Sequence, residues 1–160
     1  MLAVIARGDE RLALTGVDAT VAFCLRQVPA ILARAESAGL RERLHPDPLP
    51  NDPARNAEWH RLVDSELEHL FEAARRTFGR DLTAADPRGG ELEFPATHLK
   101  AWMSAVNQAR IALSGQHQFD AHDMQRDAFA PGSHRDAALL QVQVLGYVMQ
   151  VLVEHAMEGA

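Results

Sequence analysis

The stretch from Ala137 to Met157 constrains the fold more than any other part of this chain. It reads AALLQVQVLGYVMQVLVEHAM, and its apolar residues leave almost no face of a helix polar. A helix that is apolar nearly all round is a buried one. Its length is marginal for a membrane span, and its glutamines, Glu154 and the lack of a flanking cationic anchor argue against one. We therefore expect a core helix around which the other helices pack, with another backbone close to Gly146.

Composition limits the classes of partner. The 160 residues suit a single domain covering residues 1–160, and 47% hydrophobic content favours an ordered core. A formal net charge of −6 disfavours non-specific binding to nucleic acid or to an anionic membrane. The apolar run at the N-terminus is too short for a signal peptide, so we expect a cytoplasmic protein with neither nucleic acid nor membrane as its direct partner.

Two short runs near the N-terminus alternate in apolar character and are joined by Gly8-Asp9, which predicts a β-hairpin. Residues 91–94, Glu-Leu-Glu-Phe, alternate in the same way and can add a third strand to it.

Apolar residues spaced by three and four predict a first helix from Val17, with Pro29 bending it or ending it early and Gly39 closing it. A connector follows, HPDPLPNDP at residues 45–53, whose four prolines favour an extended, stiff segment. Asp52 then resembles an N-cap for a second helix that begins at Pro53.

The second helix is expected to end at Gly79, and a third to run from Pro95 to about Gly115. Residues 116–136 lack a sustained period and are interpreted as a mobile loop. The predicted fold is mainly α, with four principal helices packed around the buried C-terminal one and a small N-terminal hairpin at the edge.

The densest set of metal-ligand side chains lies in that loop, at His117, Asp120, His122 and Asp123. A loop can gather such groups around zinc or another divalent ion. No obvious third element completes the set in sequence, although His60, Asp64 or His69 could join it in three dimensions. The alternative is an ordinary polar loop without a cofactor.

Other candidate groups favour structural interpretations. Glu66-x-x-His69 has the spacing of a di-iron motif but occurs once, which favours a solvated polar face. Cys24 is the single cysteine and lies on the apolar stripe of the first helix, so we expect it to be buried.

Asn107 and Arg110 lie three residues apart on one face of the third helix, close to Trp102. The structural interpretation is a buried bridge, with Arg110 pairing with Asp47 or Asp52 of the connector. The functional interpretation is a partner-binding hot spot, because arginine and tryptophan are enriched at such places.

Three blocks together resemble the DUF2017 family of uncharacterised bacterial proteins: HPDPLPNDPARNAEWHRLVDSEL, AWMSAVNQARIAL and LGYVMQVLVEHAM. The resemblance implies a small cytoplasmic helical protein, often encoded near the adaptor of the Clp protease, with some members linked to redox-dependent transcription through a sigma-factor partner. It implies no active site. A switch that needs two cysteines cannot operate in a chain with Cys24 alone.

These observations favour a non-enzymatic protein-protein interaction or regulatory module whose partner is a transcription or protease-adaptor component. A homodimer formed through Trp59 or Trp102 is compatible with that role. The alternative function is a metal-binding protein or metal-dependent hydrolase that uses the loop carrying His117 and His122.

Overall fold

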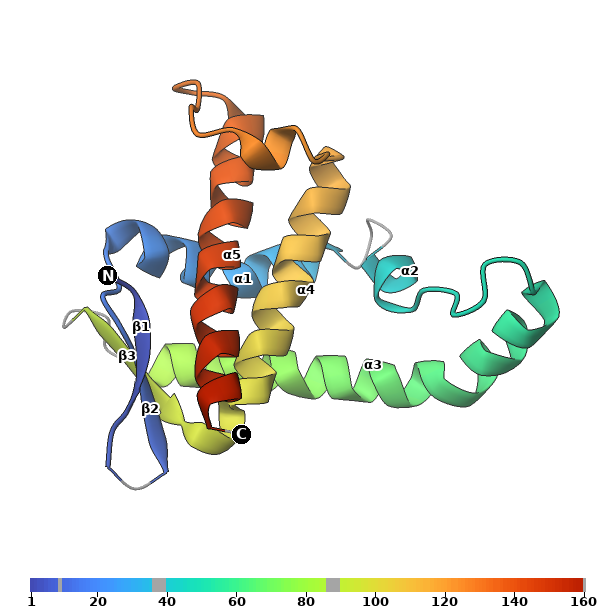
Figure 1. Ribbon diagram of the computed structural model, residues 1–160, viewed down its shortest axis with the longest axis horizontal. Helices are drawn as coiled ribbons and strands as arrows, with labels where there is room; N and C mark the ends of the chain where they lie inside the picture. The colour runs from blue at the N-terminus through green and yellow to red at the C-terminus, as the bar shows by residue number, and fades with distance from the viewer. Residues whose placement is uncertain (9, 36–39, 86–89, 160) are drawn as a thin grey trace.

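The computed structural model describes residues 1–8, 10–35, 40–85 and 90–159. It is mainly helical, with one small sheet at the edge of the helices (Figure 1). The elements in chain order are β1 Ala3–Ala6, β2 Arg11–Thr15, α1 Ala19–Ala35, α2 Leu40–Leu44, α3 Pro53–Ala84, β3 Glu91–Pro95, α4 Leu99–His117 and α5 His134–Glu158. Short 3-10 turns lie at Ala96–His98 and Asp123–Gln125. The predicted fold class is confirmed.

The sheet is antiparallel in the order β1-β2-β3, so the third strand does join the hairpin. Leu14 pairs with Val4 on one side and with Leu92 on the other. Leu12, Leu14, Leu92 and Phe94 are buried, as the alternation of the strands requires when one face covers the helices. Gly8 takes a positive φ at the turn between β1 and β2, and the predicted partner in that turn, Asp9, lies outside the described residues.

The packing centres on α4 rather than on α5. α4 contacts α1, α2, α3 and α5, and its buried Ala105, Ala109 and Ala112 let neighbouring helices approach closely. α5 packs mainly against α4 and keeps Leu140, Tyr147 and Met157 exposed. The C-terminal helix is therefore a core helix on one side only, because its apolar residues cover more of its surface than its neighbours can bury.

Within the described residues, α5 is the one helix long and apolar enough to cross a membrane. This follows from its length and composition only, and the core helices of globular proteins can be equally long and apolar. In this fold α5 contacts α4, α1 and β1.

Trp102 of α4 anchors the junction between the helices and the sheet. Its ring stacks on Phe94 of β3 at 4.2 Å between centroids and meets Phe78 of α3 edge-on at 4.8 Å. Its Nε1 donates to Asp81 Oδ2 at 2.8 Å, and the His98 ring lies 2.9 Å from the same carboxylate oxygen. A fully buried indole thus keeps its one donor satisfied.

The structure differs from the helix prediction at the end of α3 and by the presence of α2. α3 continues through Gly79 to Ala84, since a single glycine costs a helix only about 1 kcal/mol relative to alanine. α1 continues past Pro29 to Ala35, and the predicted closing residue Gly39 lies outside the described residues. The short α2 was not predicted, because five residues are too few to show a period.

Several polar contacts hold the segment between α4 and α5, which the sequence predicts as a mobile loop. Arg126 donates twice to the Asp136 carboxylate at 2.9 Å, and Ala130 N donates to the same group at 2.7 Å. The Ser133 hydroxyl caps α5 by accepting from the Asp136 amide. These contacts join residues up to ten positions apart, which a search for periodic patterns does not detect.

The N-terminal part of α3 projects beyond the other helices (Figure 1). We call residues 53–70 the arm. Asn56 is the only buried residue of the arm, whereas Ala74 and Phe78 in the following turns are core residues. One helix of 32 residues therefore serves as a core element at its C-terminal end and as an exposed arm at its N-terminal end.

Candidate functional site

The proline-rich connector is fixed along one side of the arm. Asp52 caps α3 by accepting from the Arg55 amide at 3.1 Å, as predicted, and Pro53 occupies the first turn. The buried Asn56 side chain donates to the Leu49 carbonyl and accepts from the Leu49 amide. Asn56 thus satisfies the Leu49 amide and shares the Leu49 carbonyl with the Asp52 amide, which fixes a connector residue that lies outside the helices and strands.

Two histidines and three carboxylates continue this attachment. We call His45, Asp47, His60, Asp64 and Glu68 the latch. His60 bridges two carboxylates, with Nε2 at 2.7 Å from Asp47 Oδ1 and Nδ1 at 2.9 Å from Asp64 Oδ1. His45 Nε2 lies 3.2 Å from Glu68 Oε2. All five side chains therefore connect residues 45 and 47 of the connector to α3.

His45 is the buried member of the latch, with 3% of its side chain exposed, and its ring meets Phe71 edge-on at 5.7 Å. Its Nδ1 lies 3.1 Å from Asp64 Oδ1, the oxygen that His60 also contacts, but is not aligned for a hydrogen bond. Two imidazoles therefore converge on one carboxylate oxygen.

The charges of the latch support one another. The hydrogen bonds to Asp64 and then to Asp47 raise the pKa of His60 above its ordinary value. In return, the hydrogen bond from His60 lowers the pKa of the Asp64 carboxyl. Arg41 and Glu42 of α2 line the same hollow, of about 370 Å³, beside His45, His60 and Asp64. The latch thus favours a protonated His60 held between the side chains of Asp47 and Asp64.

The opposite side of the arm is apolar and exposed. Trp59 is 46% exposed, Leu62 64% and Leu70 58%. Large apolar side chains scattered singly on a surface are ordinary, but these three follow one helix away from the body of the protein. The arm therefore has one face fixed by polar contacts to the connector and one apolar face open to solvent.

A family model for a domain of unknown function, DUF2017, matches residues 5–156, which include the latch, the arm and most of the sheet and the core. The chain belongs to the DUF2017 family. No curated protein and no solved structure matches it. Family membership of this DUF2017 protein thus describes its fold unit and leaves its biochemical role to be inferred from the site.

The loop proposed as a metal site in the DUF2017 chain is organised by other contacts. Arg135 donates to both carboxylate oxygens of Asp123, at 2.9 and 2.8 Å. Asp120 and Asp123 each accept from the other's backbone amide. His117 stacks on Phe119 at 5.4 Å, and burial lowers its pKa, while His122 is exposed.

In the described part of this DUF2017 chain, no three His, Cys, Asp or Glu side chains are arranged to hold a metal ion. Divalent metal binding by His117, Asp120, His122 and Asp123 stays a prediction that the geometry does not support. The pairing of Asp123 with Arg135 holds the pKa of its carboxyl well below the usual range, so an arginine already supplies the counter-charge that a metal would provide.

The second predicted site is divided between the core and an interhelical contact. Trp102 is fully buried, which leaves it no surface to offer a partner in this fold.

Arg110 is not paired with the connector, since Asp47 contacts His60 and Asp52 caps α3. Its buried Nε lacks a hydrogen-bond partner, and its guanidinium lies over Gly146 of α5. The neighbour expected at Gly146 is thus a side chain rather than a backbone. Asn107 is half-buried on α4.

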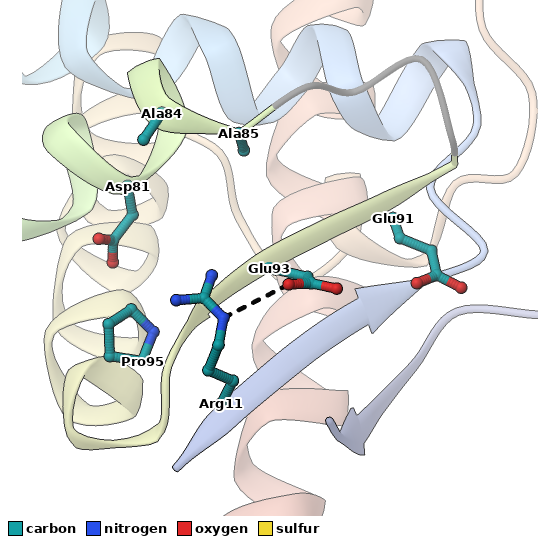
Figure 2. A pocket seen from close by; sticks show the side chains of 7 residues that line it. All are labelled: Arg11, Asp81, Ala84, Ala85, Glu91, Glu93 and Pro95. Carbon is teal, nitrogen blue, oxygen red and sulfur yellow. Dashed lines mark hydrogen bonds and ion pairs between the residues drawn. The ribbon is translucent and has the colours of Figure 1, made fainter. Parts of the chain in front are cut away.

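A hollow of about 490 Å³ between the C-terminal end of α3 and the edge strand β3 is a further candidate in the DUF2017 fold (Figure 2). Its charged groups are already paired. Arg11 Nε lies 3.3 Å from Glu93 Oε2, Glu91 accepts from Arg7, and Asp81 is held by Trp102 and His98 (Figure 2 shows the first pair). These pairs stabilise the sheet and its junction with α3, and each charged side chain among the described residues that line the hollow has a partner within the chain.

Sequence reasoning missed two polar groups that organise this DUF2017 protein. Gln108 of α4 is 1% exposed, accepts from Arg75 Nε at 2.6 Å and donates to Ser104 Oγ and to the Phe71 carbonyl. His45 joins the latch from the connector. The spacing of four between His60 and Asp64 was a visible signal for part of the latch, but nothing in the sequence placed residues 45 and 47 beside them.

Proposed function

We propose that this protein is a non-enzymatic protein-binding module in the cytoplasm and that the apolar face of the arm is its docking surface. The observation that carries the proposal is the exposure of Trp59, Leu62 and Leu70 on a helix that leaves the body of the fold. Exposed apolar side chains of this size that gather on one face of a helix mark interaction surfaces, and tryptophan is enriched at the centres of such surfaces. Components of transcription or proteolysis are the first heterologous partners to test.

The geometry of the latch supports a positioning role for its two histidines, His45 and His60. All four of its ring nitrogens lie within 3.2 Å of a carboxylate of the same chain. Both His60 nitrogens and His45 Nε2 are hydrogen-bonded, and His45 Nδ1 is buried, so neither imidazole presents an open nitrogen to a substrate as general acid or base. The latch instead holds the connector against the arm, which keeps the apolar face rigid and lowers the entropy lost when a partner binds.

The test is photo-crosslinking from the arm in living cells. A photo-activated amino acid replaces Leu62, and a matched protein carries it at Met157, which is exposed at the far end of α5. We expect a discrete protein adduct from position 62 that is absent or much weaker from position 157. The mass of the adduct separates a second copy of the chain from a different protein.

Equal labelling from positions 62 and 157, or no adduct from position 62 in a correctly folded protein, would contradict the proposal. Circular dichroism of both purified proteins checks that the substitutions leave the helical content unchanged.

A further inference from the structure

Four residues form one straight stripe along the exposed face of the arm: Arg55, Trp59, Leu62 and Glu66. Their successive spacings are four, three and four residues, the repeat that keeps side chains on one face of an α-helix. All four are exposed, and the latch residues His60 and Asp64 lie on the other side of the helix. The stripe therefore lies away from the latch, and of its four described residues Arg55 alone contacts the connector, at Asp52.

The spacings along the stripe are symmetric about its midpoint between Trp59 and Leu62. One end of the stripe is the positive Arg55, and the other end is the negative Glu66. If two such helices pack antiparallel about a two-fold axis that passes between Trp59 and Leu62, each Arg55 faces Glu66 of the other copy. Each Trp59 then faces Leu62 of the other copy. An isologous dimer interface requires a patch that is complementary to itself, and this stripe has that property.

The charge of the arm also suits a second copy. The exposed charged residues of the arm are Arg55, Arg61, Glu58 and Glu66, two of each sign, although the whole chain has a formal net charge of −6. Two arms thus meet without the repulsion expected between the acidic bodies, whereas a strongly basic or acidic partner finds no excess charge to pair with. Arg55 already forms an ion pair with Asp52, through Nε at 3.5 Å, but its side chain is 76% exposed, so its other guanidinium nitrogens are open to a second contact.

The contact is short. Residues 55–66 span about 17 Å of helix, which places the buried area at the low end of specific interfaces. The expected complex is therefore concentration-dependent and reversible.

We propose that the arm binds the same arm of a second copy, in an antiparallel pair centred between Trp59 and Leu62 and closed at each end by Arg55 and Glu66. This inference rests on the proposed function, because it names the partner of that same surface.

Sedimentation equilibrium of the full chain, from micromolar to submillimolar concentration, tests it. We expect a monomer-dimer equilibrium, and we expect Leu62→Asp to raise the dissociation constant by about tenfold or more, as removal of a central apolar contact does. Tyr147→Asp is the matched control, since Tyr147 is 44% exposed on α5 and away from the arm. That substitution is expected to leave the equilibrium unchanged.

Charge reversal tests the antiparallel register. Arg55→Glu alone and Glu66→Arg alone are each expected to weaken the dimer several-fold, because each places like charges in contact at both ends of the pair. The double variant Arg55→Glu, Glu66→Arg restores opposite charges and is expected to recover the wild-type dissociation constant. Circular dichroism confirms that each variant folds.

A wild-type chain that stays monomeric at submillimolar concentration would overturn this inference, and so would a dimer lost with Tyr147→Asp but kept with Leu62→Asp. Failure of the double variant to recover association would overturn the register. A monomeric chain that still gives a discrete adduct with another protein from position 62 would show that the arm binds a different protein and not a second copy. The proposed function would then stand, and this inference would not.

Discussion

At the scale of single residues, His60 makes the attachment of the connector depend on pH. Its pKa is raised above the ordinary 6.5, so its stabilising contribution is complete below 6.5 and is lost as the pH rises through the raised value. The pKa of Asp64 is lowered below 3.8, so its contribution is complete above 3.8 and is lost as the pH falls through the lowered value. The latch is therefore strongest between these limits.

We expect the thermal midpoint of the wild type to fall, relative to that of His60→Gln, as the pH rises from mildly acidic to mildly alkaline. Calorimetry across this range measures the difference, and an NMR titration of the His60 imidazole gives the raised pKa directly. His69→Gln is the control, because His69 is an exposed histidine of the same helix. Identical pH profiles for the wild type and His60→Gln would contradict the account of the latch.

Cys24 is expected to be chemically silent in the folded protein. Burial, with a smaller effect from Asp18, raises the pKa of its thiol to about 11, and its exposed fraction is 2%. The thiolate is the reactive form, so alkylation at neutral pH should be slow until the chain unfolds. Mass spectrometry after timed exposure to iodoacetamide measures this, with Leu62→Cys as the exposed positive control. Rapid modification of Cys24 under native conditions would show that α1 opens readily.

Residue-scale prediction from the sequence succeeded where a local pattern carried the information. The Asp52 cap and the burial of Cys24 both follow from spacing within one helix. The latch and Gln108 were missed, since their contacts join residues from different elements and depend on the path of the connector. The loop around His117 drew attention because its ligand-type residues are close in sequence, yet proximity along the chain did not make them converge in space.

At the scale of elements, Gln108 fixes α3 against α4. Its amide contacts Arg75, Ser104 and the Phe71 carbonyl from a fully buried position. Gln108→Ala removes the amide and leaves a cavity between the helices, with an expected loss of about 1–3 kcal/mol in the free energy of unfolding. Urea denaturation measures it. Gln150→Ala, which alters an exposed glutamine of α5, should change stability far less, and equal effects would contradict the assigned role.

Gly146 of α5 offers a substitution in the opposite direction. A Cβ at this position would lie 3.5 Å from the Arg110 guanidinium, an ordinary contact distance. Gly146→Ala is therefore expected to raise the free energy of unfolding, by up to about 1 kcal/mol, through the higher helix propensity of alanine. A rise in thermal midpoint checks the prediction. A clear loss of stability would mean that Arg110 cannot yield and that the helices already pack as closely as they can.

The helices and strands themselves were predictable because amphipathic periodicity is local. Their ends were not. α3 passes through Gly79 because the next turns carry the contacts of Asp81 to Trp102, which outweigh the helix propensity of one glycine. Likewise the apolar character of α5 predicted burial on every side, but burial depends on how many neighbours the topology supplies, and α4 occupies the centre.

At the scale of the whole molecule, the protein divides into a packed body and an arm with few buried side chains. We expect backbone amides of residues 53–66 to exchange with solvent deuterium much faster than those of α4, since local opening of the arm exposes little apolar surface. Hydrogen exchange read by mass spectrometry measures the two regions in one sample. Equal protection in a dilute, monomeric sample would show that the arm is as stable as the body.

The two tryptophans of the chain divide in the same way, one in the arm and one in the core. Trp59 is half open to water, and Trp102 is enclosed by Phe78 and Phe94. An indole emits at shorter wavelength when water is removed from its surroundings. The fluorescence of the two tryptophans therefore measures two different properties of the protein. A blue shift that depends on protein concentration and disappears in Trp59→Phe reports docking on the arm, whereas the emission of Trp102 follows only the integrity of the fold.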